Sequence, residues 1–185
     1  MKAMVYERFG SPHNFELKEV AEPASGDGDV LIRVRAASVN SWDWDLVRGA
    51  TFFSRLDGGL RAPKRTILGA DVAGTVEAIG NNVTDINVGD DVFGDISGAG
   101  FGGFAEYVSV PAELLAPKSP HLTFEQAAAV PQSGLLAIQS LRYCGPIQPG
   151  QHVLVNGAGG GAGTFTVQIA KTLGAEVTGV DSTPK

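Results

Sequence analysis

The chain has 185 residues, 43% of them apolar, a formal net charge of −6 and one cysteine. The scattered Lys and Arg residues exclude a basic surface for nucleic acid or anionic lipid, and the lone cysteine excludes an intrachain disulfide and a cysteine-built zinc site. Because no stretch approaches the roughly 20 apolar residues of a bilayer span and the start lacks a signal-peptide core, we expect a cytoplasmic protein with neither membrane nor nucleic-acid partners.

Short alternating runs dominate the first two-thirds of the chain. Residues 30–36 place apolar side chains on one face and charged ones mostly on the other, which is the period-2 pattern of a half-buried strand. Similar runs, separated by glycine-containing turns, occur at 72–79, 91–93 and 104–110. This pattern predicts a β-rich, antiparallel, barrel-like or rolled domain over residues 1–122.

A helical pattern follows. Residues 123–126 match a capping box, in which Thr123 caps a backbone N–H and the glutamine three residues later returns the bond. Pro131 interrupts a helical hydrogen-bond ladder, so we expect one helix to about Ala129 and a second over about 132–143. We place the second domain at residues 123–185.

The last third has the pattern of a βαβ unit. Residues 152–155 form a short apolar run, a glycine cluster then leads into a helix that ends at Gly174, and residues 176–180 form a second apolar run. This order predicts two parallel strands that are joined by the helix.

The glycine cluster fits the dinucleotide-binding fingerprint, with alanine in place of the first glycine. Glycine lets backbone N–H groups approach a pyrophosphate, and the helix N-terminus adds its partial positive charge. A phosphate-binding P-loop would need a Gly-Lys-Ser/Thr ending, which the cluster lacks. A glycine-rich turn without a ligand is the alternative. The cofactor-binding residues predicted here are Ala158, Gly160, Gly161, Ala162 and Gly163.

Acidic and hydroxyl residues follow the second strand of this unit. Asp181 stands 18 positions after Gly163, close to the spacing of an acid that accepts hydrogen bonds from the adenosine ribose, which favours NAD. Ser182 and Lys185 are residues that a 2′-phosphate would use, which favours NADPH. We expect NADPH, and NADH stays open.

Several blocks stand in an order that is specific to one family. They are ASVNSWD (37–43), LGADVAGTV (68–76), VGDDV (88–92), GFAEY (103–107) and AGGGAG (158–163), preceded by Glu22-Pro23. By these blocks the chain resembles the medium-chain dehydrogenase/reductase superfamily, and within it the zinc-independent quinone oxidoreductase, or zeta-crystallin-like, branch. The resemblance implies an α/β chain in which a GroES-like domain precedes the first βαβ portion of an incomplete Rossmann domain.

The resemblance also shows which groups the chain lacks. Zinc-dependent relatives carry a cysteine where this chain has Asn40 and a histidine where it has Ala70, and a short glycine-rich loop replaces their four-cysteine lobe. The resemblance therefore implies no metal. Without a Lewis acid, alcohol oxidation is disfavoured, whereas a quinone or an α,β-unsaturated carbonyl is already electrophilic and can accept a hydride. We expect a substrate of that kind.

Four residues are candidates for the two sites. Asn40 could donate an amide hydrogen bond to a carbonyl or enolate, or could be a turn residue that follows a strand. Asp43 and the loop that carries Trp42 could shape the site for a flat acceptor, or could pack. The resemblance implies that Ser133, which opens the helix after Pro131, passes near the nicotinamide.

The resemblance further implies that the nucleotide-binding domain is incomplete. Such a domain has about six strands, so we expect a fragment of a longer enzyme rather than a natural short product that works by partnering. The apolar faces of Val153, Val155 and Val177 would then be uncovered, which favours a homo-oligomer through the exposed Rossmann surface. Two other functions stay open: a nucleotide-binding module without turnover, and a structural, crystallin-like protein.

Overall fold

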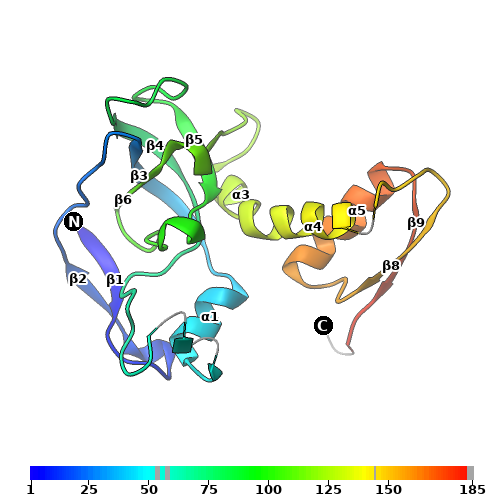
Figure 1. Cartoon of the computed structure of the whole chain (residues 1–185), viewed down its shortest axis with the longest axis horizontal. Coiled ribbons are helices and arrows are strands. Elements are labelled where there is room, and N and C mark those ends of the chain that lie inside the picture. Colours follow the sequence, from blue (N-terminus) through cyan, green and yellow to red (C-terminus); the bar gives the residue numbers. More distant parts are fainter. Residues whose placement is uncertain (53–54, 57–58, 144, 183–185) are drawn as a thin grey trace. The chain divides into compact units, whose positions relative to one another are not determined.

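The computed structural model of the chain describes residues 1–52, 55–56, 59–143 and 145–182 (Figure 1). The chain forms two compact units, Met1–Ala129 and Val130–Lys185. The first unit is rich in antiparallel strands and the second alternates helices and strands, which confirms the predicted fold class. Among the described residues, no helix combines the length and the hydropathy that crossing a bilayer requires.

In the described part of the first unit the strands are β1 (Lys2–Tyr6), β2 (Phe15–Glu19), β3 (Asp29–Ser38), β4 (Asp71–Ile79), β5 (Asp91–Asp95), β6 (Tyr107–Pro111) and β7 (Ala116–Pro117). Five of them form an antiparallel sheet in the order β6-β3-β4-β5-β7, and β1 pairs with β2. Backbone bonds tie β1 to the segment before β6, from Met4 N to Phe104 O at 2.8 Å and from Glu106 N to Lys2 O at 3.0 Å. These bonds attach the pair β1-β2 to the segment that leads into β6, the edge strand of the five-stranded sheet.

Alternating side chains of the sheet form the core of the first unit. On β3, Val30 and Ile32 are fully buried, as the period-2 pattern predicts, because the sheet presents one face to the interior. Register shifts next to Ile32 and near Val34 interrupt the pairing with β4, and the later apolar residues of this strand are only half-buried. The buried cluster consists of Val30, Ile32, Val72, Val76, Ile86, Val92, Ile96, Val108 and Val110.

The helices with described bounds in the first unit are η1 (Pro12–Asn14), α1 (Ser41–Arg48), η2 (Ser97–Ala99), η3 (Ala112–Leu114) and α3 (Phe124–Ala128), where η marks a 3-10 helix. The segment that carries Trp42 is therefore helical, and its interpretation as a loop was wrong. Gly49, in the left-handed conformation at φ +52°, ends α1.

The capping box at the start of α3 forms as predicted. Gln126 N donates to Thr123 Oγ1 at 3.2 Å, and Thr123 N donates to Gln126 Oε1 at 3.0 Å. This helix contacts β3, β4 and β5, and buries Ala127 and Ala128 beside Ala73. Because those small side chains pack on the sheet, the structure divides the chain after Ala129, whereas the sequence placed the division after residue 122.

The second unit contains α4 (Pro131–Tyr143), β8 (His152–Asn156), α5 (Gly161–Thr172) and β9 (Glu176–Val180). The strands β8 and β9 are parallel, α5 connects them, and α4 packs on α5. The predicted βαβ order is confirmed. We expected Val155 to be on an uncovered face of this unit, but Val155 is buried. Leu154, its neighbour on β8, is 69% exposed instead. The strand alternation turns Leu154 outward on the face opposite Val155.

Candidate functional site

Two predicted acceptor-site residues form the start of α1. Asn40 is the N-cap residue and Asp43 stands at the third helical position, so that the two make a capping box. Asp43 Oδ2 accepts a hydrogen bond from Asn40 N at 2.9 Å. The spacing Asn-x-x-Asp is close to the capping pattern of Ser/Thr-x-x-Glu/Gln, so the sequence held a signal for this helix. The local role of both residues is to fix where α1 begins.

Asp43 also joins α1 to the segment before β4. Asp43 is only 2% exposed, and its Oδ1 accepts a hydrogen bond from Gly69 N at 3.0 Å. Burial raises the pKa of the Asp43 carboxyl, while backbone N–H donors, with Asn40 first among them, act in the opposite direction. The carboxylate is thus held by the backbone of two segments, which is the arrangement of a positioning residue.

Asn40 belongs to a partly buried polar cluster at the end of β3 and the start of β4. Ser38 and Asp71 are cross-strand partners, and Ser38 Oγ donates to Asp71 Oδ2 at 2.9 Å. Asn40 Nδ2 donates to Ser38 Oγ at 3.0 Å and to Asp71 Oδ2 at 3.2 Å. The amide donors that we predicted for a substrate carbonyl are therefore directed at Ser38 and Asp71.

Sequence reasoning missed the roles of Ser38 and Asp71. Asp71 is 1% exposed and opens β4, where its neighbours along the strand are apolar. An acid within a buried apolar run requires hydrogen-bond donors, and this was the available signal. Among the described residues, no three His, Cys, Asp or Glu side chains gather in the manner of a metal site.

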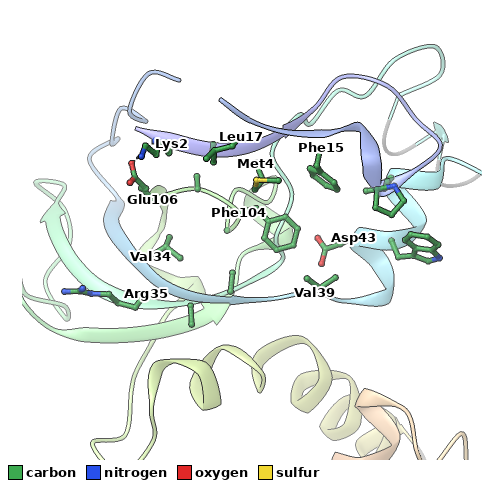
Figure 2. A pocket seen from close by; sticks show the side chains of 18 residues that line it. Lys2, Met4, Phe15, Leu17, Val34, Arg35, Val39, Asp43, Phe104 and Glu106 are labelled. Atoms are coloured by element: carbon green, nitrogen blue, oxygen red, sulfur yellow. Dashed lines mark hydrogen bonds between the residues drawn. The ribbon is translucent and has the colours of Figure 1, made fainter. Parts of the chain in front are cut away.

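A large, mainly apolar cavity lies beside α1 in the first unit. Its volume is about 760 Å³, and side chains of β1, β2 and β3 line it together with Phe104 and Asp43 (Figure 2). Figure 2 shows Asp43 among the labelled side chains near Val39 and Phe104. Trp42 is not part of this lining, although Trp44 is. The two tryptophans of α1 therefore face different surroundings.

The glycine loop of the second unit leaves backbone donors available at the start of α5. Gly157, at φ +80°, turns the chain away from β8, and Gly160 is the N-cap residue. The first intrahelical bond runs from Thr164 N to Gly160 O at 2.9 Å. The preceding N–H groups, those of Gly161, Ala162 and Gly163, have no intrahelical acceptor, as at any helix N-terminus. These are the groups that an anion at this end of α5 would bind.

Close packing explains the residue types in this loop. A Cβ atom on Gly163 would lie 2.0 Å from Gly157 O, so only glycine fits between the loop and α5. Ala158 stands where the fingerprint has its first glycine, and its methyl group packs against Gly179 of β9, where an added Cβ would lie 2.9 Å away. The glycine at position 179 thus provides the room that Ala158 needs.

Ser133 and Asp181 both lie against the glycine loop. A Cβ atom on Gly161 would lie 2.7 Å from Ser133 Oγ, so α4 brings this hydroxyl to the start of α5. Asp181 Oδ2 accepts from Gly159 N at 2.5 Å, and Oδ1 accepts from Ser182 N at 2.7 Å. Lys185 lies outside the described residues. Backbone donors, a hydroxyl and a carboxylate therefore surround one helix N-terminus, and this donor set fits a dinucleotide.

Comparison with known families decides the assignment of the chain. The family described as the alcohol dehydrogenase GroES-like domain matches residues 26–120, which is half of the chain. The chain belongs to the medium-chain dehydrogenase/reductase superfamily. This confirms the resemblance that the sequence blocks indicated.

Relatives of this superfamily align along almost the whole chain. A 2-methylene-furan-3-one reductase of Solanum lycopersicum is 36% identical over 92% of the chain and 44% of its own length. An NADPH-dependent alkenal/one oxidoreductase of Arabidopsis thaliana is 34% identical over 92% and 44%. The solved quinone oxidoreductase of Coxiella burnetii superposes with a TM-score of 0.87 at 32% identity, over 99% of this chain and 57% of that one. The chain spans about half the length of the curated relatives that it matches.

Proposed function

We propose that the chain belongs to an NAD(P)H-dependent oxidoreductase that transfers a hydride to a quinone or an α,β-unsaturated carbonyl without zinc. The observation that carries this proposal is the donor set at the start of α5, where the N–H groups of Gly161, Ala162 and Gly163 adjoin Ser133 and Asp181. The names of the relatives, which are reductases of enones and quinones, support the acceptor class.

Each part of this donor set has a defined task toward a dinucleotide. The N–H groups of Gly161, Ala162 and Gly163 bind the pyrophosphate, with the partial positive charge of the helix end behind them. The Ser133 hydroxyl adds a donor at Gly161. The bound cofactor supplies the hydride, and the protein supplies its position.

The preferred cofactor of this proposal is NADPH. Both oxygens of Asp181 accept backbone N–H groups, from Gly159 and from Ser182, so the carboxylate is directed at the backbone. The Ser182 hydroxyl stands beside it, and a 2′-phosphate would take that hydroxyl as a donor. The name of the Arabidopsis relative, which specifies NADPH, supports the same preference.

Zinc independence rests on the donor set of the first unit. At the positions where the resemblance places a cysteine and a histidine, this chain has Asn40, whose Nδ2 is bonded to Ser38 and Asp71, and Ala70, which has no ligand atom. Neither residue offers the thiolate or imidazole that catalytic zinc prefers. An acceptor of this protein must therefore be electrophilic without a metal.

We also propose association of identical chains through the second unit. Leu154 of β8 and Leu135 and Leu136 of α4 are exposed apolar side chains on this unit. Covering such side chains with a second copy removes apolar area from water. Light scattering coupled to gel filtration tests this: a mass of one chain at micromolar concentration contradicts it.

The test of the proposed function is a fluorescence titration of the 185-residue chain with NADPH and with NADH, followed by 1,4-benzoquinone. We expect saturable binding, tighter for NADPH, and oxidation of the bound cofactor after the quinone is added. Binding without oxidation would indicate a nucleotide-binding module, and the absence of both would favour a structural protein.

A matched pair of variants shows whether the titration reports the proposed site. Ser133→Ala removes the hydroxyl beside Gly161, and we expect the affinity for NADPH to fall about fivefold. Ser140→Ala changes an exposed serine of the same helix, and we expect no change. Equal effects of the two substitutions would contradict the placement of the cofactor at the start of α5.

A further inference from the structure

The glycine loop of the second unit is bonded to the end of β9. Gly157 N and Ala158 N both donate to Val180 O, at 2.8 Å and 3.1 Å, and Gly159 N donates to Asp181 Oδ2 at 2.5 Å. Three successive N–H groups of the loop are therefore directed at the strand end. Of the acceptors in these three bonds, only Asp181 is a side chain, so it is the one that a substitution can remove.

These bonds determine which N–H groups are left for a ligand. Gly160 N donates back to Gly157 O at 3.0 Å, and the first intrahelical bond of α5 is made by Thr164 N. The N–H groups of residues 161–163 lie between these two bonds and have no acceptor within the helix. They begin two residues after Gly159, so their positions depend on where β9 holds the loop.

Packing also presses the loop against β9. A Cβ atom on Gly179 would lie 2.9 Å from the Ala158 Cβ atom, so the methyl group of Ala158 lies directly on the strand. Asp181 follows Gly179 by two residues. The strand thus holds the loop by a close contact at one residue and by a carboxylate at the next.

The carboxylate that holds Gly159 is itself held by its neighbour. Ser182 N donates to Asp181 Oδ1 at 2.7 Å, and Ser182 Oγ lies 3.4 Å from the same oxygen. One oxygen therefore faces the next residue of the chain and the other faces the loop. Hydrogen bonds to a carboxylate are shorter and stronger than neutral ones, so this pair of bonds favours one rotation of the side chain.

The charge of Asp181 opposes an anion at this loop. A negative charge near a pyrophosphate repels it, so the carboxylate does not aid that ligand through its field. Its bond to Gly159 N aids the ligand in another way, because an N–H group that is already placed loses less freedom on binding. A role toward the ribose hydroxyls is the alternative that the spacing in the sequence indicates.

We propose that Asp181 is a positioning residue for the pyrophosphate part of the cofactor site. It holds Gly159 so that the N–H groups of residues 161–163 converge on one anion, and it acts through the loop without contact to the phosphate. This proposal rests on the proposed function and assigns a residue to its pyrophosphate site. The predicted acceptor of ribose hydroxyl groups thereby becomes a support of the glycine loop.

Two substitutions of Asp181 separate its hydrogen bond from its charge. Asp181→Ala removes the acceptor of Gly159 N, whereas Asp181→Asn keeps an oxygen acceptor and removes only the charge. Calorimetric titration with inorganic pyrophosphate measures the phosphate site alone. We expect the affinity to fall about fivefold in Asp181→Ala and to change by less than about twofold in Asp181→Asn. Tighter binding in both variants would mean that the charge only repels the anion, and overturns the proposal.

Adenosine, which carries the ribose without a phosphate, is the second probe. We expect its affinity to change by less than about twofold in both variants, because a positioning residue of the loop does not touch the ribose. A loss of adenosine binding at unchanged pyrophosphate binding would assign Asp181 to the ribose and overturn the proposal. The absence of pyrophosphate binding to the parent chain would also overturn it.

Glu176→Ala is the matched control for charge. Glu176 is an exposed acid at the other end of β9, and its removal changes the net charge by the same amount. We expect the pyrophosphate affinity to change by less than about twofold, since solvent and salt screen an exposed charge. A loss equal to that of Asp181→Ala would make the loss a charge effect and contradict the positioning role.

Amide hydrogen exchange followed by NMR tests the hold on the loop without a ligand. Asp181→Ala should speed exchange at Gly159, whose acceptor is lost, and leave the rate at Gly157, whose acceptor is Val180 O. Asp181→Asn should restore the rate at Gly159. Equal acceleration at both glycines would mean that the whole loop has unfolded, and an unchanged rate at Gly159 would mean that Asp181 does not hold it. Either result overturns the proposal.

The two proposals fail in different ways. Oxidation of NADPH together with equal pyrophosphate affinity in the parent chain and in Asp181→Ala would keep the function and overturn the positioning role. A fivefold loss of pyrophosphate affinity together with faster exchange at Gly159, but without oxidation of NADPH, would keep the positioning role and contradict the proposed function.

Discussion

The glycine loop and the start of α1 are both candidate sites at helix N-termini, and they are built in opposite ways. The loop consists of backbone: Gly163 is required because a Cβ atom would lie 2.0 Å from Gly157 O, and the first N–H groups of α5 have no acceptor within the helix. The start of α1 consists of side chains: Asn40 and Asp43 cap the helix and Asp71 receives the amide of Asn40. A site made of backbone leaves a sequence motif, whereas a site made of side-chain hydrogen bonds depends on which segments meet.

The largest expected effect comes from a substitution that disrupts the glycine loop before α5. Gly163→Ala places a Cβ atom 2.0 Å from Gly157 O, and we expect the affinity for NADPH to fall at least a hundredfold, about 3 kcal/mol, because the loop must move. Gly160→Ala places its Cβ atom 3.3 Å from the same oxygen and should cost much less. Fluorescence titration of the two variants measures both affinities for NADPH. Equal losses of affinity would show that steric clash with Gly157 O is not the reason for glycine at position 163.

The second prediction concerns a substitution that disrupts the hydrogen bonds at the start of α1. Asp43→Ala leaves the N–H groups of Asn40 and Gly69 without their acceptor, and we expect the free energy of unfolding to fall by about 2 to 3 kcal/mol. Urea unfolding followed by tryptophan fluorescence reports this unit, because both tryptophans lie on α1. The control Asp45→Ala, an exposed acid of the same helix, should change stability by less than about 0.5 kcal/mol.

The third prediction compares the two capping boxes of the first unit. Thr123→Ala should cost about 1 kcal/mol, which is the usual cost of losing an N-cap side chain. Asn40→Ala should cost about 2 kcal/mol, since it also removes donors from Ser38 and from buried Asp71. The same urea experiment measures both. If Asn40→Ala costs no more than Thr123→Ala, the cluster of Ser38, Asn40 and Asp71 adds nothing to stability.

The smallest expected effect is a pH dependence. Burial raises the pKa of Asp43 above the 3.8 of an ordinary aspartate, so the folded state binds the proton more tightly than the unfolded state. Its contribution to stability is fully present below pH 3.8 and is lost as pH rises to the folded pKa. Asp43→Asn should remove this part of the pH profile in urea unfolding. An unchanged profile would contradict the assignment of the slope to Asp43.

Much of the fold could be predicted because it depends on local patterns. The alternation on β3, the capping box at Thr123 and the strand-glycine-helix order around Gly160 all act over a few residues, and the structure confirms each. The helix α1 was missed because its first turn, Ser41 to Trp44, has the composition of a loop. The boundary between the two units lies after Ala129 rather than after residue 122, because Ala127 and Ala128 pack on the sheet of the first unit. No local pattern indicates that packing.

The sequence by itself determined the superfamily, the alternation of the strands and the glycine loop, because backbone conformation and close approach require particular residue types at fixed spacing. Only the tertiary structure decided that Asp71 accepts a hydrogen bond from Asn40, and that Phe101 contacts both Trp42 and Arg65. Those contacts join residues 31 to 59 positions apart. A side-chain hydrogen bond or ring contact acts over a few ångströms in space, so its partners are set by how the strands and loops pack.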